Sequence, residues 1–164
     1  MLFRSSSGGH KNILLVQADL EKLPFPPESF SKINFSEVVE HLERPEKVLR
    51  ELHRILRKDG RMAVTTWPNK AHLVWNWRYR HGRGLTEDFN PQTPLTLSRL
   101  LREAGLEILE MRLTNFYLHI PRTRWEVDGC TQGNVIARFC EKVLTKRPWG
   151  DYLATSINIL CRRS

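Results

Sequence analysis

The pattern of hydrophobic and polar positions along this chain predicts five strands, of which the last is the longest. Residues 13–16 form a continuous apolar run, which is typical of a strand buried on both faces of a parallel sheet. A proline-rich connection separates this run from a second strand expected at about residues 32–36. Further strands are expected at residues 61–67, 106–113 and 152–161.

Three helices are predicted between these strands. The first begins at Pro45 and runs to about residue 57, with apolar side chains at helical spacing and Asp59-Gly60 as its predicted end. Thr93-Pro94 has the form of a capped helix start, and Gly105 that of a helix stop. A third helix is expected at residues 134–146.

This order of strands and helices favours a single α/β domain over residues 1–164, with helices on both faces of the sheet. A length of 164 residues suits one hydrophobic core. The last strand is predicted to be antiparallel to its neighbours.

Composition narrows the class of protein. With 40% hydrophobic and 27% charged residues, the chain has an ordinary globular composition. It has no apolar stretch of the ~20 residues that a transmembrane segment needs, and its N-terminal apolar run is too short for a signal peptide. Three cysteines without close spacing indicate reduced thiols and a cytoplasmic location. The histidines show no ligand pair at helical spacing, so no metal site is expected.

The net charge of +8 is spread along the chain, although residues 111–164 carry nine basic and four acidic side chains. A nucleic-acid binder would concentrate such charge on one helix or arm, so this function is the least favoured. Residues 75–84 alternate aromatic and arginine side chains inside a segment without periodicity, residues 68–93. This segment is interpreted either as a lid or acceptor-binding insert or as a loop whose arginines are solvated.

Polar groups follow the first two strands, at the strand ends where open α/β sheets bind ligands. Asp19 comes after the first strand, and Ser36-Glu37 end the second. A carboxylate on a short loop can accept hydrogen bonds from an amino group such as that of a purine. The alternative for Asp19 is a turn cap before Leu20-Glu21, and spacing alone favours that alternative.

Several of these segments, in this order, resemble the class I S-adenosylmethionine-dependent methyltransferases, in particular the methyltransferase type 11 group that acts on small molecules, quinones and lipids. The matching segments are DLEKLPF at 19–25, SF at 29–30, SEVVEHL at 36–42, LRELHRILR at 49–57, GR at 60–61, TTWPN at 65–69 and LSRLLREAGL at 97–106. The resemblance covers residues 13–113 and implies a Rossmann-like sheet with an antiparallel last strand.

The resemblance also implies a cofactor site. S-adenosyl-L-methionine would be converted to S-adenosyl-L-homocysteine, with Asp19 approaching the adenine amino group and the backbone of Leu20 reading the adenine edge. Ser36 and Glu37 would lie beside the methionine part, with His41 close by. Orientation and desolvation supply most of such catalysis, so the sequence assigns no catalytic residue.

One departure from the family is large. The family begins with a strand, a glycine-rich turn that opens a helix and a second strand, and only twelve residues precede Ile13 here. The chain therefore resembles an N-terminally truncated domain, either with a misassigned start at Met1 or as a natural short form. Its first strand must pair elsewhere, leave an exposed edge, or use strands of a second copy or partner chain.

The sequence thus predicts a methyltransferase acting on a small-molecule or lipid-like acceptor. The alternative is a non-catalytic methyltransferase-like module with an interaction or regulatory role.

Overall fold

The computed structural model describes residues 2–3, 14–67, 69–70, 90–116 and 154–164. The helix predicted at residues 134–146, and nearly all of the insert predicted at 68–93, lie outside the described residues.

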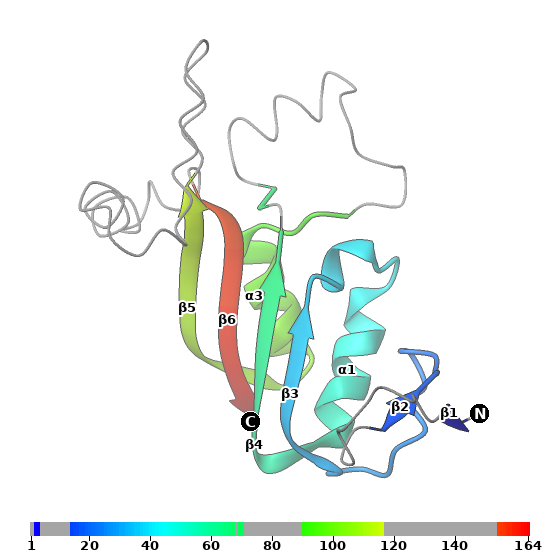
Figure 1. Ribbon diagram of the computed structural model, residues 1–164. Helices are drawn as coiled ribbons and strands as arrows, with labels where there is room; N and C mark the ends of the chain where they lie inside the picture. The colour runs from blue at the N-terminus through cyan, green and yellow to red at the C-terminus, as the bar shows by residue number, and fades with distance from the viewer. Residues whose placement is uncertain (1, 4–13, 68, 71–89, 117–153) are drawn as a thin grey trace, which may run out of the picture.

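A four-stranded mixed sheet forms the centre of the molecule (Figure 1). Its strands are β3 (Phe30–Ser36), β4 (Leu56–Thr66), β5 (Leu106–Phe116) and β6 (Ala154–Arg163), in the spatial order β3-β4-β6-β5. β3 and β4 are parallel, whereas β6 is antiparallel to both of its neighbours. The prediction of an antiparallel last strand is therefore confirmed, and β6 is inserted between β4 and β5.

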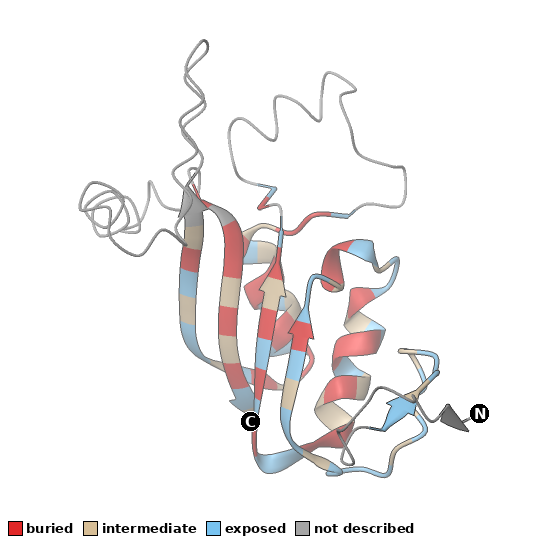
Figure 2. Cartoon of the chain, in the orientation of Figure 1, coloured by how far each residue is buried: buried red, intermediate tan, exposed pale blue. Residues whose placement is uncertain are grey.

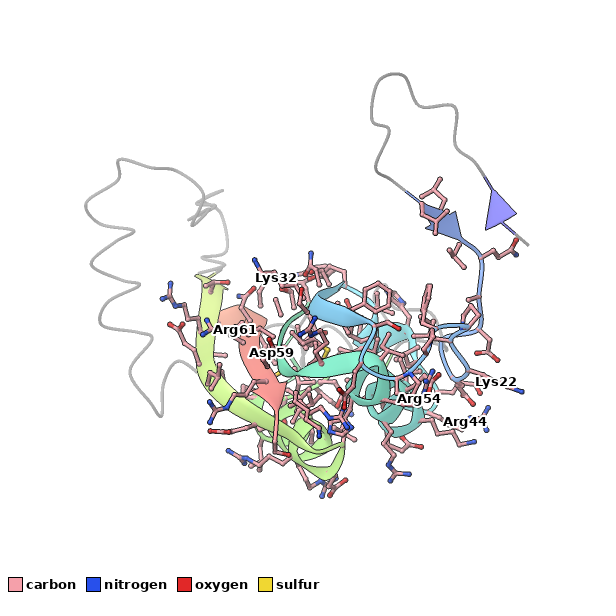
Figure 3. The ribbon with its side chains drawn as sticks, turned by 90° about the horizontal axis from the view of Figure 1, so that it is seen from below. Lys22, Lys32, Arg44, Arg54, Asp59 and Arg61 are labelled. Carbon is pink, nitrogen blue, oxygen red and sulfur yellow. The ribbon has the colours of Figure 1, made fainter. Side chains whose placement is uncertain are left out.

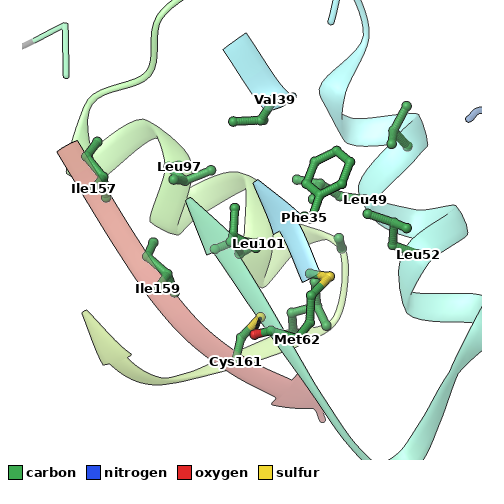
Figure 4. Packing of buried hydrophobic residues seen from close by; sticks show 14 of the residues in the cluster. Phe35, Val39, Leu49, Leu52, Met62, Leu97, Leu101, Ile157, Ile159 and Cys161 are labelled. Atoms are coloured by element: carbon green, nitrogen blue, oxygen red, sulfur yellow. Dashed lines mark hydrogen bonds between the residues drawn. The ribbon is translucent and has the colours of Figure 1, made fainter. Parts of the chain in front are cut away.

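Two helices, α1 (Pro45–Ile55) and α3 (Pro94–Glu103), cover one face of this sheet and contact each other. The core lies between the helices and that face (Figures 2 and 4). Every second residue is buried in the second half of β4, from residue 60 to 66, and in β6 from residue 157 to 161, and β3 contributes the buried Phe35. The central side chains are Phe35, Val39, Leu49, Leu52, Met62, Val64, Leu97, Leu101, Ile157, Ile159 and Cys161. Whether a helix also covers the second face stays a prediction, because the third predicted helix lies outside the described residues.

The second face of the sheet is polar. Lys32, Asn34 and Ser36 alternate with the core residues of β3 and are exposed, and Lys32 lies on the side of the sheet away from the helices (Figure 3). Across the neighbouring strands, Thr65 Oγ1 donates to Asn158 Oδ1 (3.3 Å), and Asn158 Nδ2 donates to Thr114 Oγ1 (2.8 Å). These hydrogen bonds connect β4, β6 and β5 across this face of the sheet.

The first predicted strand does not enter the main sheet. β2 (Leu15–Val16) pairs antiparallel with β1 (Leu2–Phe3) in a separate two-stranded sheet. The expectation of burial on both faces is wrong, since Leu14 is 63% exposed and Leu15 48% exposed. The physical reason is that β3 is the last strand of the main sheet on this side, and no described parallel strand connects it to β2. Of the alternatives open from sequence, pairing elsewhere is the one found.

The predicted helix boundaries are confirmed at α3 and wrong by two residues at α1. Thr93 Oγ1 accepts from the backbone N–H of Thr96 (3.0 Å), and Thr96 Oγ1 accepts from that of Thr93 (2.8 Å), which forms a capping box. At the other end, Gly105 has φ +83°, as a helix stop requires. Helix α1 ends at Ile55 because Leu56 is fully buried and begins β4, so Asp59-Gly60 lies inside that strand.

Candidate functional site

Glu37 lies where the parallel strands β3 and β4 end, and its backbone is fixed in an unusual conformation. Its N–H donates to the carbonyl of Thr65 on β4 (2.9 Å), and its φ is +55°, in the left-handed region that favours glycine. Ser36, the last residue of β3, donates from Oγ to Asn34 Oδ1 (2.7 Å). The backbone of Glu37 is therefore held in a fixed position at the end of the sheet, and its side chain extends from there.

Glu40, three residues later, is a buried carboxyl group at the same strand ends. It belongs to the 3₁₀ helix η1 (Val39–His41) and is only 1% exposed. Thr66 Oγ1 at the end of β4 donates to Glu40 Oε2 (2.9 Å), and the backbone N–H of Asn90 donates to the carbonyl of Glu40 (2.6 Å). Glu40 thus connects η1, β4 and the segment that leads into α3.

The two carboxyl groups influence each other directly. Partial burial, the charge of Glu40 and a side-chain hydrogen bond with Glu40, in that order, raise the pKa of Glu37 to about 7. Two carboxyl groups can form a hydrogen bond only when a proton lies between them, because an ionised carboxylate is an acceptor alone. Glu37 at the strand ends therefore gains or loses its proton near neutral pH, well above the range of an ordinary glutamate.

His41 follows Glu40 on η1 and is exposed. Its backbone N–H donates to the carbonyl of Val38 (3.0 Å), which closes the turn after β3. Ser36, Glu37 and His41 are thus brought to one end of the sheet, and their contact with a cofactor stays a prediction.

Asp19 and Leu20 lie in the segment between β2 and β3. Asp19 Oδ1 accepts from the backbone N–H of Glu21 (2.9 Å), which is the turn-cap contact that spacing favoured. Asp19 also lines an open hollow of about 460 Å³ together with apolar and polar neighbours. Its lining includes Leu14, Val16, Gln17, Lys22, Pro24 and Phe25.

The segment that carries Asp19 is attached to α1 through Arg54. The Nη2 group of Arg54 donates to the carbonyls of Phe25 (2.9 Å) and Leu23 (3.2 Å), and the guanidinium also pairs with Glu51 (2.7 Å). Glu51 Oε1 accepts from the backbone N–H of Leu23 (2.9 Å). Glu51 and Arg54 therefore both bind the backbone of residues 23–25. Arg44, on the same side of the molecule, pairs with Glu21 at 2.9 Å (Figure 3).

The sequence-predicted residues therefore form two groups. Ser36, Glu37 and His41 are at the carboxyl end of β3, whereas Asp19 and Leu20 are on the segment held against α1. None of the residues that line the hollow at Asp19 belongs to the strand-end group. Each of the two groups has polar atoms that could bind one part of a cofactor. The described residues of the two groups do not form one continuous site.

Sequence reasoning missed Glu40 and Thr66. The signal for Glu40 was present in the spacing: two carboxylates three residues apart, directly after a strand, fall on one side of a helical turn. Its burial could not be read from the sequence, because it depends on Thr66 and on Asn90, which are distant along the chain.

No described helix is long and apolar enough to cross a membrane. No group of three or more histidine, cysteine, aspartate or glutamate side chains among the described residues is arranged to hold a metal ion.

The chain is similar in sequence to known methyltransferases. A family profile described as a methyltransferase domain matches residues 2–64, which include Asp19, Ser36, Glu37, Glu40 and His41. The ubiquinone/menaquinone biosynthesis C-methyltransferase UbiE of Rhizobium rhizogenes is 25% identical over 125 residues, covering 64% of this chain and 48% of the relative. The same enzyme of an Enterobacter species is 40% identical over 119 residues, covering 60% and 47%.

A third relative extends over more of the chain. A probable S-adenosylmethionine-dependent methyltransferase of Mycobacterium tuberculosis is 27% identical over 154 residues, covering 90% of this chain and 51% of the relative. The chain spans about half the length of the curated relatives it matches.

Solved structures share the fold. An S-adenosylmethionine-dependent methyltransferase of Thermotoga maritima aligns with 91% of this chain and 63% of its own, with a TM-score of 0.63 and 19% identity. A methyltransferase structure from Bacillus halodurans aligns with 94% and 73%, with a TM-score of 0.60 and 17% identity.

Proposed function

We propose that the chain binds S-adenosyl-L-methionine and transfers its methyl group to a small-molecule or lipid-like acceptor. The proposal is supported by the similarity of the chain, in sequence and in fold, to the class I S-adenosylmethionine-dependent methyltransferases. The observation that carries the proposal is Glu37. It is a carboxyl-bearing residue fixed by its backbone at the shared end of β3 and β4, inside the segment that matches the family.

The chemistry of the described residues fits the charges of this cofactor. The methionine part carries an ammonium group and a sulfonium, and the ionised carboxylate of Glu37 offers a negative partner to such cations. At the second group, Asp19 retains a carboxylate oxygen for an amino group, and the apolar side chains of Val16 and Phe25 offer a surface for a flat ring.

When bound, the cofactor supplies an electrophilic methyl group on a sulfonium that leaves as a neutral thioether. The work left to the protein is to orient the reactants and to exclude water, since the leaving group is already good. Glu37 and His41 would orient the methionine part, and the backbone of Leu20 would contact the adenine edge. We assign no catalytic residue.

Two exposed apolar side chains support an apolar acceptor. Trp67 directly follows β4 and is 36% exposed, and Leu95 in the first turn of α3 is 77% exposed. The end of β4 and the start of α3 lie at the same end of the molecule (Figure 1). Such side chains suit a quinone-like or lipid-like molecule, and the UbiE relatives are named for ubiquinone and menaquinone biosynthesis.

Titration calorimetry with S-adenosyl-L-homocysteine tests the proposal. We expect measurable binding to the chain and affinity about tenfold weaker in Asp19→Ala, the cost of roughly one hydrogen bond. The matched control is Asp59→Ala, which removes an exposed aspartate paired with Arg57 and should leave affinity unchanged. No heat at millimolar ligand would contradict the proposal, and unchanged affinity in Asp19→Ala would contradict the placement of the adenine.

One observation favours a second candidate function. The hollow at Asp19 and the strand-end group share no lining residue, as expected of a methyltransferase-like module that has an interaction or regulatory role without catalysis. The same calorimetry separates the two candidates, because this module would not bind S-adenosyl-L-homocysteine.

A further inference from the structure

We propose that the sheet face away from α1 and α3 binds an acidic amphipathic helix of a partner protein, through three neighbouring basic side chains and the hollow beside them. The basic side chains are Lys32 on β3, Arg61 on β4 and Arg162 on β6, which we call the cationic row. None of the three belongs to the strand-end group or to the hollow at Asp19, so the inference does not depend on the proposed function.

The first step is that the register of the sheet brings the cationic row together. Lys32 is paired with Arg61 on the parallel strand β4, and Arg61 is paired with Arg162 on the antiparallel strand β6. Paired residues point to the same face of a sheet, and neighbouring strands lie only about 4.8 Å apart. All three residues are exposed, and Lys32 lies on the side of the sheet away from the helices (Figure 3). Three basic side chains therefore lie next to one another across three strands.

The second step is that the charge of the cationic row is only partly neutralised. Glu107 on β5 pairs with Arg162 (2.8 Å), and Asp59 pairs with an arginine outside the row (3.1 Å). No carboxylate among the described residues forms an ion pair with Lys32 or Arg61. Like charges directly opposite each other destabilise a sheet, so the cationic row lowers stability unless an anion binds to it.

The third step is that an apolar area adjoins the cationic row on the same face. Ala63 and Leu160 are paired across β4 and β6, and each lies two residues from a member of the row. Ala63 is exposed and Leu160 half-buried, and both line a hollow of about 390 Å³. The lining of this hollow also includes Thr65, Glu110, Arg112 and Asn158. The surface thus combines a small apolar area with basic side chains along one side of it.

An acidic amphipathic helix fits this combination. Helices are the elements that cover sheet faces, and a helix about 10 Å wide covers two or three strands. Its apolar stripe would pack on Ala63 and Leu160, and carboxylates beside that stripe would meet the cationic row. A single small anion would reach only part of the row, because three strands extend over about 10 Å.

Other occupants fit this surface less well. A nucleic acid needs a continuous basic path and side chains on which bases stack, whereas Glu107 and Glu110 border the surface on β5. None of the side chains that form the cationic row or line the hollow is aromatic. The chain's own helix predicted at residues 134–146 has three basic side chains and one acidic, so it would not neutralise the row.

Fluorescence anisotropy with a labelled peptide tests the proposal on the whole chain. The probe has about 14 residues, or four helical turns, with an alanine and leucine stripe flanked by glutamates. The control peptide has glutamine in place of every glutamate. We expect the acidic peptide to bind at low salt and to bind more weakly as salt screens the charges, and the glutamine peptide to bind at least about tenfold more weakly than the acidic one.

Variants of the cationic row identify the surface that binds the probe. Arg61→Gln removes the central charge and should weaken binding by about fivefold, the upper range for one exposed ion pair. The double variant Lys32→Gln, Arg61→Gln should weaken binding by at least about tenfold. Arg102→Gln is the matched control, because it removes one exposed charge from α3 on the other face and should leave binding unchanged. Thermal unfolding of the row variants should occur at a temperature no lower than that of the wild type, since they relieve repulsion.

Amide NMR of the wild type with the acidic peptide locates the contact without any substitution, and we expect shifts at Arg61, Ala63 and Leu160. No binding at low salt, unchanged binding in the double variant, an equal loss in Arg102→Gln, or shifts confined to other residues would overturn the proposal. A single-stranded oligonucleotide that binds more tightly than the peptide and loses affinity in the same variants would assign the row to nucleic acid, which also overturns it.

Discussion

At the scale of single residues, three backbone positions in the described part of the chain adopt the left-handed conformation. They are Glu28 (φ +58°), Glu37 (φ +55°) and Gly105 (φ +83°). The N–H of Glu28 donates to the carbonyl of Arg54 (3.0 Å), as that of Glu37 does to Thr65. This conformation costs a residue with a side chain about 1–2 kcal/mol. A strained residue therefore lies on each side of β3, Glu28 before it and Glu37 after it. Strain at Glu37 is consistent with a functional role, because strained residues persist where the surrounding structure fixes them.

Gly105 allows the first residue-scale prediction. Gly105→Ala should lower the free energy of unfolding by about 1–2 kcal/mol, because alanine is disfavoured at positive φ. A Cβ at this position would also approach Nε2 of His53 to 3.0 Å, so the contact between α1 and the end of α3 would have to shift. Urea unfolding measures the change. Arg102→Ala, exposed on the last turn of α3, should change stability by less than about 0.5 kcal/mol. Equal stability of Gly105→Ala and wild type would contradict the prediction.

At the scale of elements, the sequence predicted those structures whose signals are local. The start of α3 follows from Thr93-Pro94 and its end from Gly105, because capping and positive φ depend on neighbours within a few residues. The end of α1 was predicted two residues late, since Leu56 leaves the helix in order to pair with Phe30 on β3. β2 was assigned to the wrong sheet for the same reason, because strand partners are chosen by distant parts of the chain.

The candidate site follows the same rule. Glu37 could be found from its place after a strand, whereas Glu40 became significant only through Thr66, twenty-six residues away. Conversely, the spacing of Asp19 correctly indicated a turn, and that turn lies beside a hollow which no sequence pattern describes.

The attachment of the Asp19 segment to α1 leads to an element-scale prediction. Arg54→Ala removes the donors to the carbonyls of Leu23 and Phe25 and leaves Glu51 without its partner. The amide of Leu23 should then exchange with solvent at least about tenfold faster, since a net loss of about 1.4 kcal/mol in local stability corresponds to that factor. Amide hydrogen exchange followed by NMR measures the rate.

The control for this prediction lies on the same helix. Arg50→Ala removes an exposed arginine one turn earlier and should leave the Leu23 amide unchanged. An unaltered exchange rate in Arg54→Ala would show that the segment is held by its apolar contacts, such as the edge-to-face packing of Phe25 on Phe30, and not by the arginine.

At the scale of the whole molecule, the described sheet differs on its two faces and its two edges. One face contacts α1 and α3, and the other carries the bonded polar side chains of Thr65, Asn158 and Thr114. The edge at β3 has no partner strand among the described residues. An unpaired strand edge is a template for pairing with another chain, and exposed apolar side chains nearby strengthen such pairing.

Self-association through the β3 side follows from this arrangement. Leu14, just before β2, and Leu15, in β2, are both exposed. β2 lies on the side of the molecule where β3 is the last strand of the main sheet (Figure 1). We expect the sedimentation coefficient of the chain to rise with protein concentration, and the double variant Leu14→Lys, Leu15→Lys to shift the equilibrium toward monomer by placing charges along the contact. Leu95→Lys introduces the same charge at a more exposed leucine on α3 and should leave association unchanged. A wild-type chain that sediments as a monomer at every concentration, or a Leu95→Lys variant that dissociates as the double variant does, would contradict an interface at this side of the sheet.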